Sequence, residues 1–242
     1  LSDLWNRAVM LFHAARIAGL RRMPCLLAVA VVVLVLAAGQ ALPARAGEHL
    51  ADRVGDRGLG RSTAPIVMIE YYSLDCPHCA AFHLDAFPQL KAEFIDTGKV
   101  RFVFRDFPLS WAALEAAIMT HCAPPERYFD MQDALLRSGE QWSKAESTRK
   151  AVGEIGAAQG VSEATFQACL EARVWEQQVF ESQKFARDVL GVKATPTFII
   201  NNDKLEGNIP FEKLSMGLTR LLNEITRHSD DFTSLEIPIQ AE

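Results

Sequence analysis

One stretch of the sequence decides the fold: it is IVMIEYYSLDCPHCAAFHL, residues 66–84. Its first seven residues, 66–72, are mostly apolar and β-prone, which predicts a buried central strand. A short turn follows, and the apolar residues after it recur at helical spacing. Pro88 is expected to kink or restart that helix. Two cysteines, Cys76 and Cys79, therefore lie in the first turn of a helix that follows a buried strand.

The motif Cys76-Pro77-His78-Cys79 in this context predicts a redox-active dithiol. A thiolate at a helix N-terminus faces unpaired backbone N–H groups and the positive end of the helix dipole, and both lower its pKa. Pro77 suits a first helical turn, because the N–H that it lacks has no intrahelical partner there. A protonated His78 adds a positive charge close by. We expect Cys76 to be the exposed nucleophile and Cys79 its buried partner.

A zinc site and a structural disulfide are the two other uses of such a motif. Zinc usually takes four ligands. His83 can be a third ligand, but no second Cys-x-x-Cys and no pair of histidines follows, so we predict no metal site. A structural disulfide that closes so short a loop stabilises little. A redox-sensing or zinc-binding protein that uses the same cysteines stays as a minor alternative.

The first 46 residues have the pattern of a secretory signal peptide that is removed. Arg21-Arg22 precedes an apolar run at 25–38, and Ala44-Arg45-Ala46 is a small-x-small cleavage site. The apolar run is shorter than the roughly 20 residues of a membrane span. A membrane-anchored form with an uncleaved signal stays open. We therefore expect export to the periplasm, with residues 47–63 as an extended leader.

The chain after residue 46 is acidic. It holds 20 basic and 29 acidic residues, a net charge of about −9. Such a balance argues against nucleic acid as a partner, because phosphate binding needs a basic face. Four cysteines remain, at positions 76, 79, 122 and 169, and an even number suits disulfide chemistry in an exported protein. The remaining 196 residues are enough for one domain with an inserted subdomain.

The pattern along the chain predicts three further parts. A strand at 100–104 completes a βαβ unit with the first strand and helix, for which a right-handed crossover is expected. Residues 107–190 are predicted to form an all-helical insertion. Its aromatic residues are expected in the core rather than at a cofactor. They are Trp111, Trp142, Phe166, Trp175, Phe180 and Phe185.

Strand patterns return after the insertion. Residues 197–201 and 204–207 predict two antiparallel strands joined by a tight turn. An amphipathic helix is expected from residue 211 to about 227. The acidic tail, 228–242, is expected to be frayed.

This arrangement resembles the DsbA family of exported thiol:disulfide oxidoreductases, in the thioredoxin superfamily, over about residues 60–227. Cys76-Pro77-His78-Cys79 is similar to the active-site motif of that family. Glu70 lies six residues before the first cysteine, and it matches the acidic residue that the family buries beneath its dithiol. The segment 191–198, GVKATPTF, resembles the one that carries the cis-proline of the superfamily, here at Pro196.

The resemblance implies an α/β fold class: a thioredoxin-like fold with an inserted all-helical domain. Residues 64–106 and 191–227 would form the thioredoxin-like domain, and 107–190 the insertion. Helical subdomains of some family members carry a second disulfide. We expect such a structural bridge between Cys122 and Cys169, although free buried thiols fit their helical core positions as well. Closing that loop would stabilise the fold by about 4 kcal/mol on the chain-entropy estimate.

The resemblance also implies roles for individual residues. Pro196 precedes a strand and, if cis, turns the chain so that the backbone of Thr195 faces the dithiol. These two residues, with Pro77, are expected to bind the substrate. A buried Glu70 should have a raised pKa and could move a proton to and from Cys79. The residue before Pro196 is Thr where the best-known oxidases of the family have Val, so no redox potential is predicted.

The resemblance implies an enzyme, a protein-disulfide oxidoreductase that introduces disulfides into folding proteins by thiol–disulfide exchange. Its substrates would be reduced exported proteins, and it needs no cofactor besides the Cys76–Cys79 disulfide. A DsbB-like inner-membrane protein would re-oxidise it, and a monomer is expected. The alternative is a disulfide isomerase or reductase on the same fold. Isomerases of this superfamily usually carry a separate dimerisation domain, for which the few residues between the cleavage site and Ala64 are too short.

Overall fold

Residues 66–72 form β2, the central strand of a five-stranded sheet with the order β1-β3-β2-β4-β5. This computed structural model describes residue 53 and residues 55–233, with the side chains of 229–233 left out. The predicted signal segment 1–46 and residues 234–242 of the predicted tail lie outside the described residues. The strands are β1 Arg57–Leu59, β2 Ile66–Tyr72, β3 Val100–Asp106, β4 Thr197–Ile200 and β5 Asp203–Glu206.

The sheet is mixed. β2 pairs in parallel with β3 and antiparallel with β4, while β1 and β5 pair antiparallel at its two edges. The connection from β2 to β3 consists of α3 (Pro77–Asp85), α4 (Phe87–Leu90) and a π-helical turn (Lys91–Ile95). The expected interruption falls at Ala86, two residues before Pro88. This βαβ connection places the first turn of α3 directly after the carboxyl end of β2.

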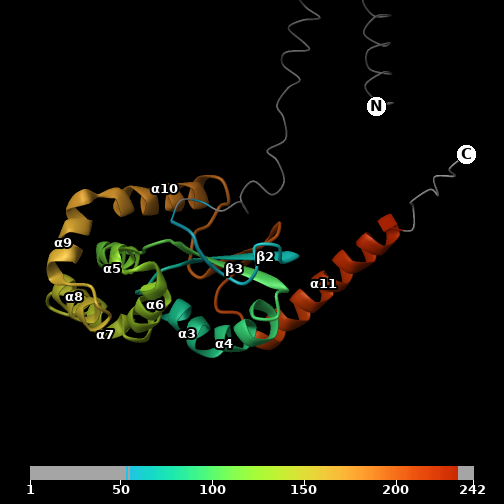
Figure 1. Ribbon diagram of the computed structural model, residues 1–242, viewed down its shortest axis with the longest axis horizontal. Coiled ribbons are helices and arrows are strands. Elements are labelled where there is room, and N and C mark those ends of the chain that lie inside the picture. Colours follow the sequence, from blue (N-terminus) through green and yellow to red (C-terminus); the bar gives the residue numbers. More distant parts are fainter. Residues whose placement is uncertain (1–52, 54, 234–242) are drawn as a thin grey trace, which may run out of the picture. The chain divides into compact units, whose positions relative to one another are not determined.

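The described residues between β3 and β4 form six α-helices and no strand. They are α5 Trp111–Cys122, α6 Tyr128–Arg137, α7 Gly139–Ser143, α8 Thr148–Ala158, α9 Glu163–Ala172 and α10 Val174–Asp188, with a 3₁₀ turn at Pro125–Arg127. Residues 163–188 of this insertion form two helices and not one, because Arg173 adopts a left-handed conformation with φ of 56°. In Figure 1, α5 to α9 gather beyond one end of the sheet, and α10 leads back toward it.

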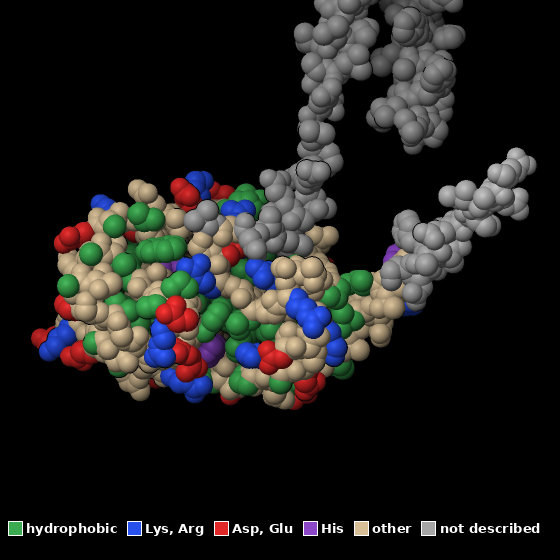
Figure 2. Space-filling model, viewed as in Figure 1, with side chains coloured by type: hydrophobic (Ala, Val, Ile, Leu, Met, Phe, Trp, Pro, Cys, Tyr) green, Lys and Arg blue, Asp and Glu red, His purple; other side chains and the backbone are tan. Residues whose placement is uncertain are grey.

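Apolar side chains cover both faces of the sheet. Ile66 and Met68 of β2 belong to a large core cluster, and Ile69 and Tyr71 belong to a second, smaller one. Alternate residues of a strand point to opposite faces, so β2 is buried on both sides, as its nearly continuous apolar sequence predicts. On the face shown in Figure 2, apolar, basic and acidic side chains are interspersed.

The prediction that all the insertion's aromatic residues are core is wrong at two positions. Trp142 and Phe166 are buried, but Trp111 is 73% exposed and Phe180 is 38% exposed. Trp111 shares a helical stripe with the buried Leu114. It is the first residue of α5, however, and there the stripe runs past the edge of the core.

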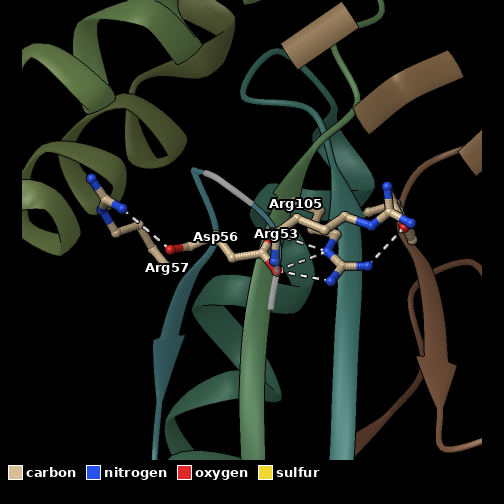
Figure 3. Close-up of polar contacts among 5 residues, drawn as sticks. Arg53, Asp56, Arg57 and Arg105 are labelled. Carbon is tan, nitrogen blue, oxygen red and sulfur yellow. Dashed lines mark hydrogen bonds and ion pairs between the residues drawn. The ribbon is translucent and has the colours of Figure 1, made fainter. Parts of the chain in front are cut away.

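Part of the predicted extended leader, residues 47–63, takes part in the sheet. Its β1 strand pairs with β3, and Asp56 lies just before it. The Asp56 carboxylate accepts hydrogen bonds from Nε and Nη2 of Arg105 at 3.0 and 2.8 Å and from the backbone N–H of Arg53 at 2.8 Å (Figure 3). The Arg53 guanidinium lies 3.5 Å from the ring centre of Phe185 on α10. A three-residue strand is too short to leave a periodic pattern, so the sequence did not indicate it.

The last part of the fold is the β4–β5 hairpin followed by α11, Phe211–Thr233. The helix continues six residues beyond the predicted end at 227, so part of the predicted frayed tail is helical. Polar residues at a helix end carry a weak signal, and boundaries are the least determined part of a pattern. No helix within residues 55–233 is both long and apolar enough to cross a membrane.

Candidate active site

Cys76 occupies the N-cap position of α3. Its backbone is extended, with φ of −86° and ψ of 117°, and Pro77 is the first residue of the helix. Both Cys76 and Cys79 are free thiols in this structure. Cys76 is 5% exposed and Cys79 is 1% exposed, so the expected difference in exposure is present but small. The expectation of an openly exposed Cys76 is wrong, because the segment at Thr195 packs against its sulfur.

The environment of Cys76 favours its thiolate. A hydrogen bond from the Cys79 thiol is the largest cause that lowers its pKa, and the pKa of Cys76 falls to about 5 although burial opposes the change. Hydrogen bonds from the Thr195 side chain and from the backbone N–H groups of Cys79 and His78 lower it further. The first turn of α3 thus supplies the donors that the sequence predicted.

The partner thiol has the opposite character. Burial raises the pKa of Cys79 well above its usual value, and the hydrogen bond to Cys76 and the negative charge of Glu70 raise it further. Near neutral pH the pair therefore holds one thiolate, at Cys76, and one protonated thiol, at Cys79. This asymmetry makes Cys76 the nucleophile and leaves Cys79 as the sulfur that carries a proton.

Glu70 lies beneath the dithiol on the central strand. Its neighbours across the sheet are Phe104 of β3 and Phe198 of β4, and its side chain is buried. Burial raises the pKa of Glu70 well above its usual value, and the charge of Cys76 adds to the rise. A carboxyl group with a raised pKa near both sulfurs can hold and release a proton during exchange, which is the role that the resemblance implied.

The segment before β4 forms the wall opposite the dithiol. Sγ of Cys76 lies 3.4 Å from the backbone carbonyl oxygen of Thr195, to which it donates a hydrogen bond when it is protonated. The Thr195–Pro196 peptide bond is cis, and both residues are buried. The Thr195 hydroxyl is buried and has no other hydrogen-bond partner. Its effect is to lower the pKa of Cys76. Of the predicted substrate-binding residues, Thr195 therefore contacts Cys76, Pro196 follows it in the chain, and the exposed Pro77 is the first residue of α3.

The two histidines of α3 have different positions. His78 is exposed, and its contribution at Cys76 comes from its backbone N–H. His83 does not join the dithiol: its Nε2 lies 3.1 Å from Asp133 of α6, and its ring stacks on Phe87. Within the described residues no group of three or more His, Cys, Asp or Glu side chains is arranged to hold a metal ion.

A set of three side chains that the sequence did not indicate holds the turn before Cys76. The Ser73 hydroxyl donates to Asp75 Oδ1 at 2.5 Å, and the Ser110 hydroxyl donates to Asp75 Oδ2 at 2.7 Å. The backbone N–H of Leu109 donates to Ser73 Oγ at 3.1 Å. We call Ser73, Asp75 and Ser110 the turn clasp. It joins the active-site turn to the start of α5, and no local pattern could pair residues 35 positions apart.

The remaining cysteines lie away from this site. Cys122, at the end of α5, and Cys169, in α9, form a disulfide with a Cα–Cα distance of 6.2 Å. The bond ties two helices of the insertion together. It is thus the bridge that the resemblance implied, and it joins two helices away from the dithiol, as a structural disulfide does.

The fold and the site define a class of protein: a thioredoxin-like domain that carries an asymmetric dithiol at a helix N-terminus. Residues 52–220 match the family model described as Thioredoxin. The crystal structure of Wolbachia pipientis alpha-DsbA1 is 31% identical, with a TM-score of 0.68 over 74% of this chain and 96% of that one. This chain therefore belongs to the thioredoxin family, and its structure is similar to that of a DsbA protein. The predicted fold class and family are confirmed.

Two further proteins are similar to this chain. A protein-disulfide isomerase from Novosphingobium aromaticivorans is 26% identical, with a TM-score of 0.61 over 69% of this chain and 97% of its own. A putative protein-disulfide oxidoreductase from Rickettsia felis is 28% identical over 170 residues, 70% of this chain and 61% of the relative. The chain thus spans about three fifths of the length of that relative.

Proposed function

We propose that this chain is an exported oxidase that introduces disulfides into folding proteins through Cys76 and Cys79. The observation that carries the proposal is the asymmetry of the dithiol: a thiolate held at the N-terminus of α3 beside a buried, protonated partner. A low pKa at Cys76 stabilises the reduced enzyme and makes its disulfide a strong oxidant.

The reaction begins with the Cys76–Cys79 disulfide. A substrate thiolate attacks Sγ of Cys76, a mixed disulfide forms, and Cys79 leaves as a thiolate that takes a proton, for which the buried Glu70 is a candidate donor. A second substrate thiolate then attacks the substrate sulfur of the mixed disulfide and releases the Cys76 thiolate. The substrate loses two electrons and two protons. The enzyme gains both electrons and one proton, at Cys79, and the second proton passes to solvent because Cys76 stays a thiolate near neutral pH. No cofactor other than the dithiol is needed.

Three parts of the proposal concern the surroundings of the enzyme. The signal-like residues 1–46 favour export to the periplasm, and reduced exported proteins are then the substrates. The reduced dithiol must return its two electrons to an acceptor, for which a DsbB-like inner-membrane protein has the right chemistry. We expect the enzyme to act as a monomer, since the residues before the domain are used in part for the edge strand β1.

The equilibrium of the dithiol with glutathione tests the oxidase against the isomerase or reductase. We expect a reduction potential closer to about −120 mV than to about −270 mV, the values of a strong oxidase and of a reductase on related folds. The Cys76→Ser variant should oxidise no reduced peptide, and Cys79→Ser should accumulate mixed disulfides through Cys76. Wild-type rates in both variants, or a potential at the reductase end, would contradict the proposal.

A further inference from the structure

A groove between the start of α5 and α10 is lined in part by exposed apolar side chains. Its volume is about 720 Å³. Leu109, 54% exposed, and Trp111, 73% exposed, lie at the start of α5, and Phe180, 38% exposed, faces them from α10. The Trp111 ring meets the Phe180 ring edge-on, with 6.0 Å between their centres. Exposed large aromatic and aliphatic side chains gathered in one concave place indicate a binding site.

Both walls of this groove end at the active site. Ser110 lines one wall and belongs to the turn clasp that holds Asp75, the residue directly before Cys76. Lys193 lines the other wall, two residues before Thr195, whose carbonyl accepts the hydrogen bond from Cys76. A polypeptide that reaches the sulfur of Cys76 along the Thr195 segment can therefore continue into the groove.

The walls of the groove are held in place by two hydrogen bonds, one of them buried. The amide of Gln183 on α10 is buried and donates to the carbonyl of Pro108 at 2.8 Å. The Ser110 hydroxyl accepts from the backbone N–H of Ala113 at 3.0 Å and caps α5. These contacts fix the segment that carries Leu109 and Trp111 against α10. The site is therefore formed before any ligand arrives, which lowers the entropic cost of binding.

The charge of the groove is opposite to that of the chain. Arg187 and Lys193 line it, and no acidic residue does. Neither basic side chain forms an ion pair with any residue that the structure describes. The chain as a whole has a net charge of −5. An apolar floor with two basic side chains at its edge suits a segment that carries an apolar side chain and a carboxylate.

We propose that this groove binds the segment of a reduced substrate that flanks its reacting cysteine. It selects substrates with a large apolar residue and an acidic residue in that segment. The inference rests on the proposed function, since the groove acts on substrates of the same dithiol. Trp111 and Leu109 anchor the apolar side chain, and Lys193 and Arg187 attract the carboxylate.

Four reduced two-cysteine peptides test the selection. They differ only in the two residues beside one cysteine: leucine with glutamate, leucine with lysine, serine with glutamate, and serine with lysine. We expect kcat/KM for oxidation to be about tenfold higher for the leucine–glutamate peptide than for the serine–lysine peptide, from one apolar contact and one exposed ion pair. Trp111→Ala should remove the preference for leucine, and Lys193→Glu should reverse the preference for glutamate over lysine.

Matched variants outside the groove serve as controls. Met216→Ser changes another highly exposed apolar side chain, on α11, and Lys150→Glu changes another exposed lysine, on α8. Both should leave all four rates and the reaction with dithiothreitol unchanged. Equal rates for the four peptides, or a Trp111→Ala variant that loses as much rate with dithiothreitol as with the peptides, would overturn the inference alone. A wild-type enzyme that oxidises none of the peptides would overturn the proposed function as well.

Discussion

Cys76 and Cys79 lie within one helical turn, yet their pKa values move in opposite directions. The difference arises because Cys76 receives hydrogen bonds at the helix start, while Cys79 points into the core above Glu70. In free solution two cysteines have the same pKa of about 8.5. At the residue scale, the sulfur that reacts is therefore the one that lies next to the three N–H and S–H donors, Sγ of Cys76.

The pKa of Cys76 can be measured directly. Alkylation of the reduced protein should follow a titration with a midpoint at about pH 5. Cys79→Ala should raise that midpoint, because the Cys79 thiol makes the largest lowering contribution. Mass analysis of the alkylated protein against pH provides the measurement. A midpoint near about 8.5, the value of a free thiol, would show that the helix start does not act on Cys76.

The turn clasp should position Cys76. Asp75→Ala leaves the hydroxyls of Ser73 and Ser110 without their acceptor, and we expect a loss of about 1–3 kcal/mol of stability. A shifted pKa at Cys76 and a lower kcat with little change in KM would separate positioning from stability alone. Asp75→Asn keeps an acceptor and should recover most of both. If Asp75→Ala melts earlier but keeps the titration and the kcat of the wild type, the clasp is only structural.

At the scale of elements, the edge strand β1 is held by charge as well as by the sheet. Asp56 and Arg105 form a buried ion pair between the residue before β1 and the end of β3. Arg105 also donates to the hydroxyl of Tyr71 on β2 at 3.1 Å. Hydrogen bonds of this kind hold a three-residue strand that its backbone pairing alone would hold weakly.

Breaking this ion pair should destabilise the fold. Asp56→Ala leaves the Arg105 charge buried without a partner, and we expect a loss of about 3–5 kcal/mol in the free energy of unfolding. The double variant Asp56→Ala with Arg105→Met should be more stable than the single one, because it removes the unpaired charge. Urea unfolding of both provides the comparison. Equal stability of Asp56→Ala and the wild type would show that the pair contributes nothing.

At the scale of the whole molecule, the dithiol lies where the insertion meets the thioredoxin-like domain. α3 contacts α6 and α7, and α10 contacts β3. Gly139, at the start of α7, packs so closely that a Cβ atom there would lie 2.7 Å from the carbonyl oxygen of Leu74. With the turn clasp, the insertion therefore touches the turn before Cys76 from two helices. The inserted helices shape the site as well as adding to the core.

The redox state should change how stability depends on pH. In the reduced protein the pKa of Cys76 is about 5 when folded, whereas an unfolded cysteine has about 8.5. Between these values the unfolded chain binds more protons, so the stability of the reduced form rises with pH and is lost as pH falls toward 5. The oxidised form has no thiol to titrate at Cys76. Burial raises the pKa of Glu70 in both forms.

We therefore expect the urea midpoint of the reduced form to rise relative to that of the oxidised form from about pH 5 to about pH 8. Reduction mild enough to leave the Cys122–Cys169 bond intact keeps the comparison to the dithiol. The Cys76→Ser variant, which cannot form the dithiol bond, should lose this pH dependence. Parallel pH profiles for the reduced and oxidised wild type would contradict the assignment of the thiolate to Cys76.

The sequence alone determined the strand, the turn and the helix that carry Cys76 and Cys79. It could do so because burial on both faces of a strand and the spacing of a helix are recorded in neighbouring residues. The chemistry of the dithiol followed from the same local pattern. The spacing of apolar residues could not place Glu70, Thr195 or Pro196 at the site. These three residues were predicted there because they match positions of the DsbA family.

Only the tertiary structure decided which distant segments meet at the dithiol. Thr195 lies 119 residues from Cys76, and Ser110 lies 35 residues from Asp75. The exposure of Trp111, the edge strand that begins at Arg57 and the basic groove all depend on how the insertion packs on the sheet. Periodicity reports which face of an element is apolar. Whether another element covers that face is settled by the packing of the whole chain.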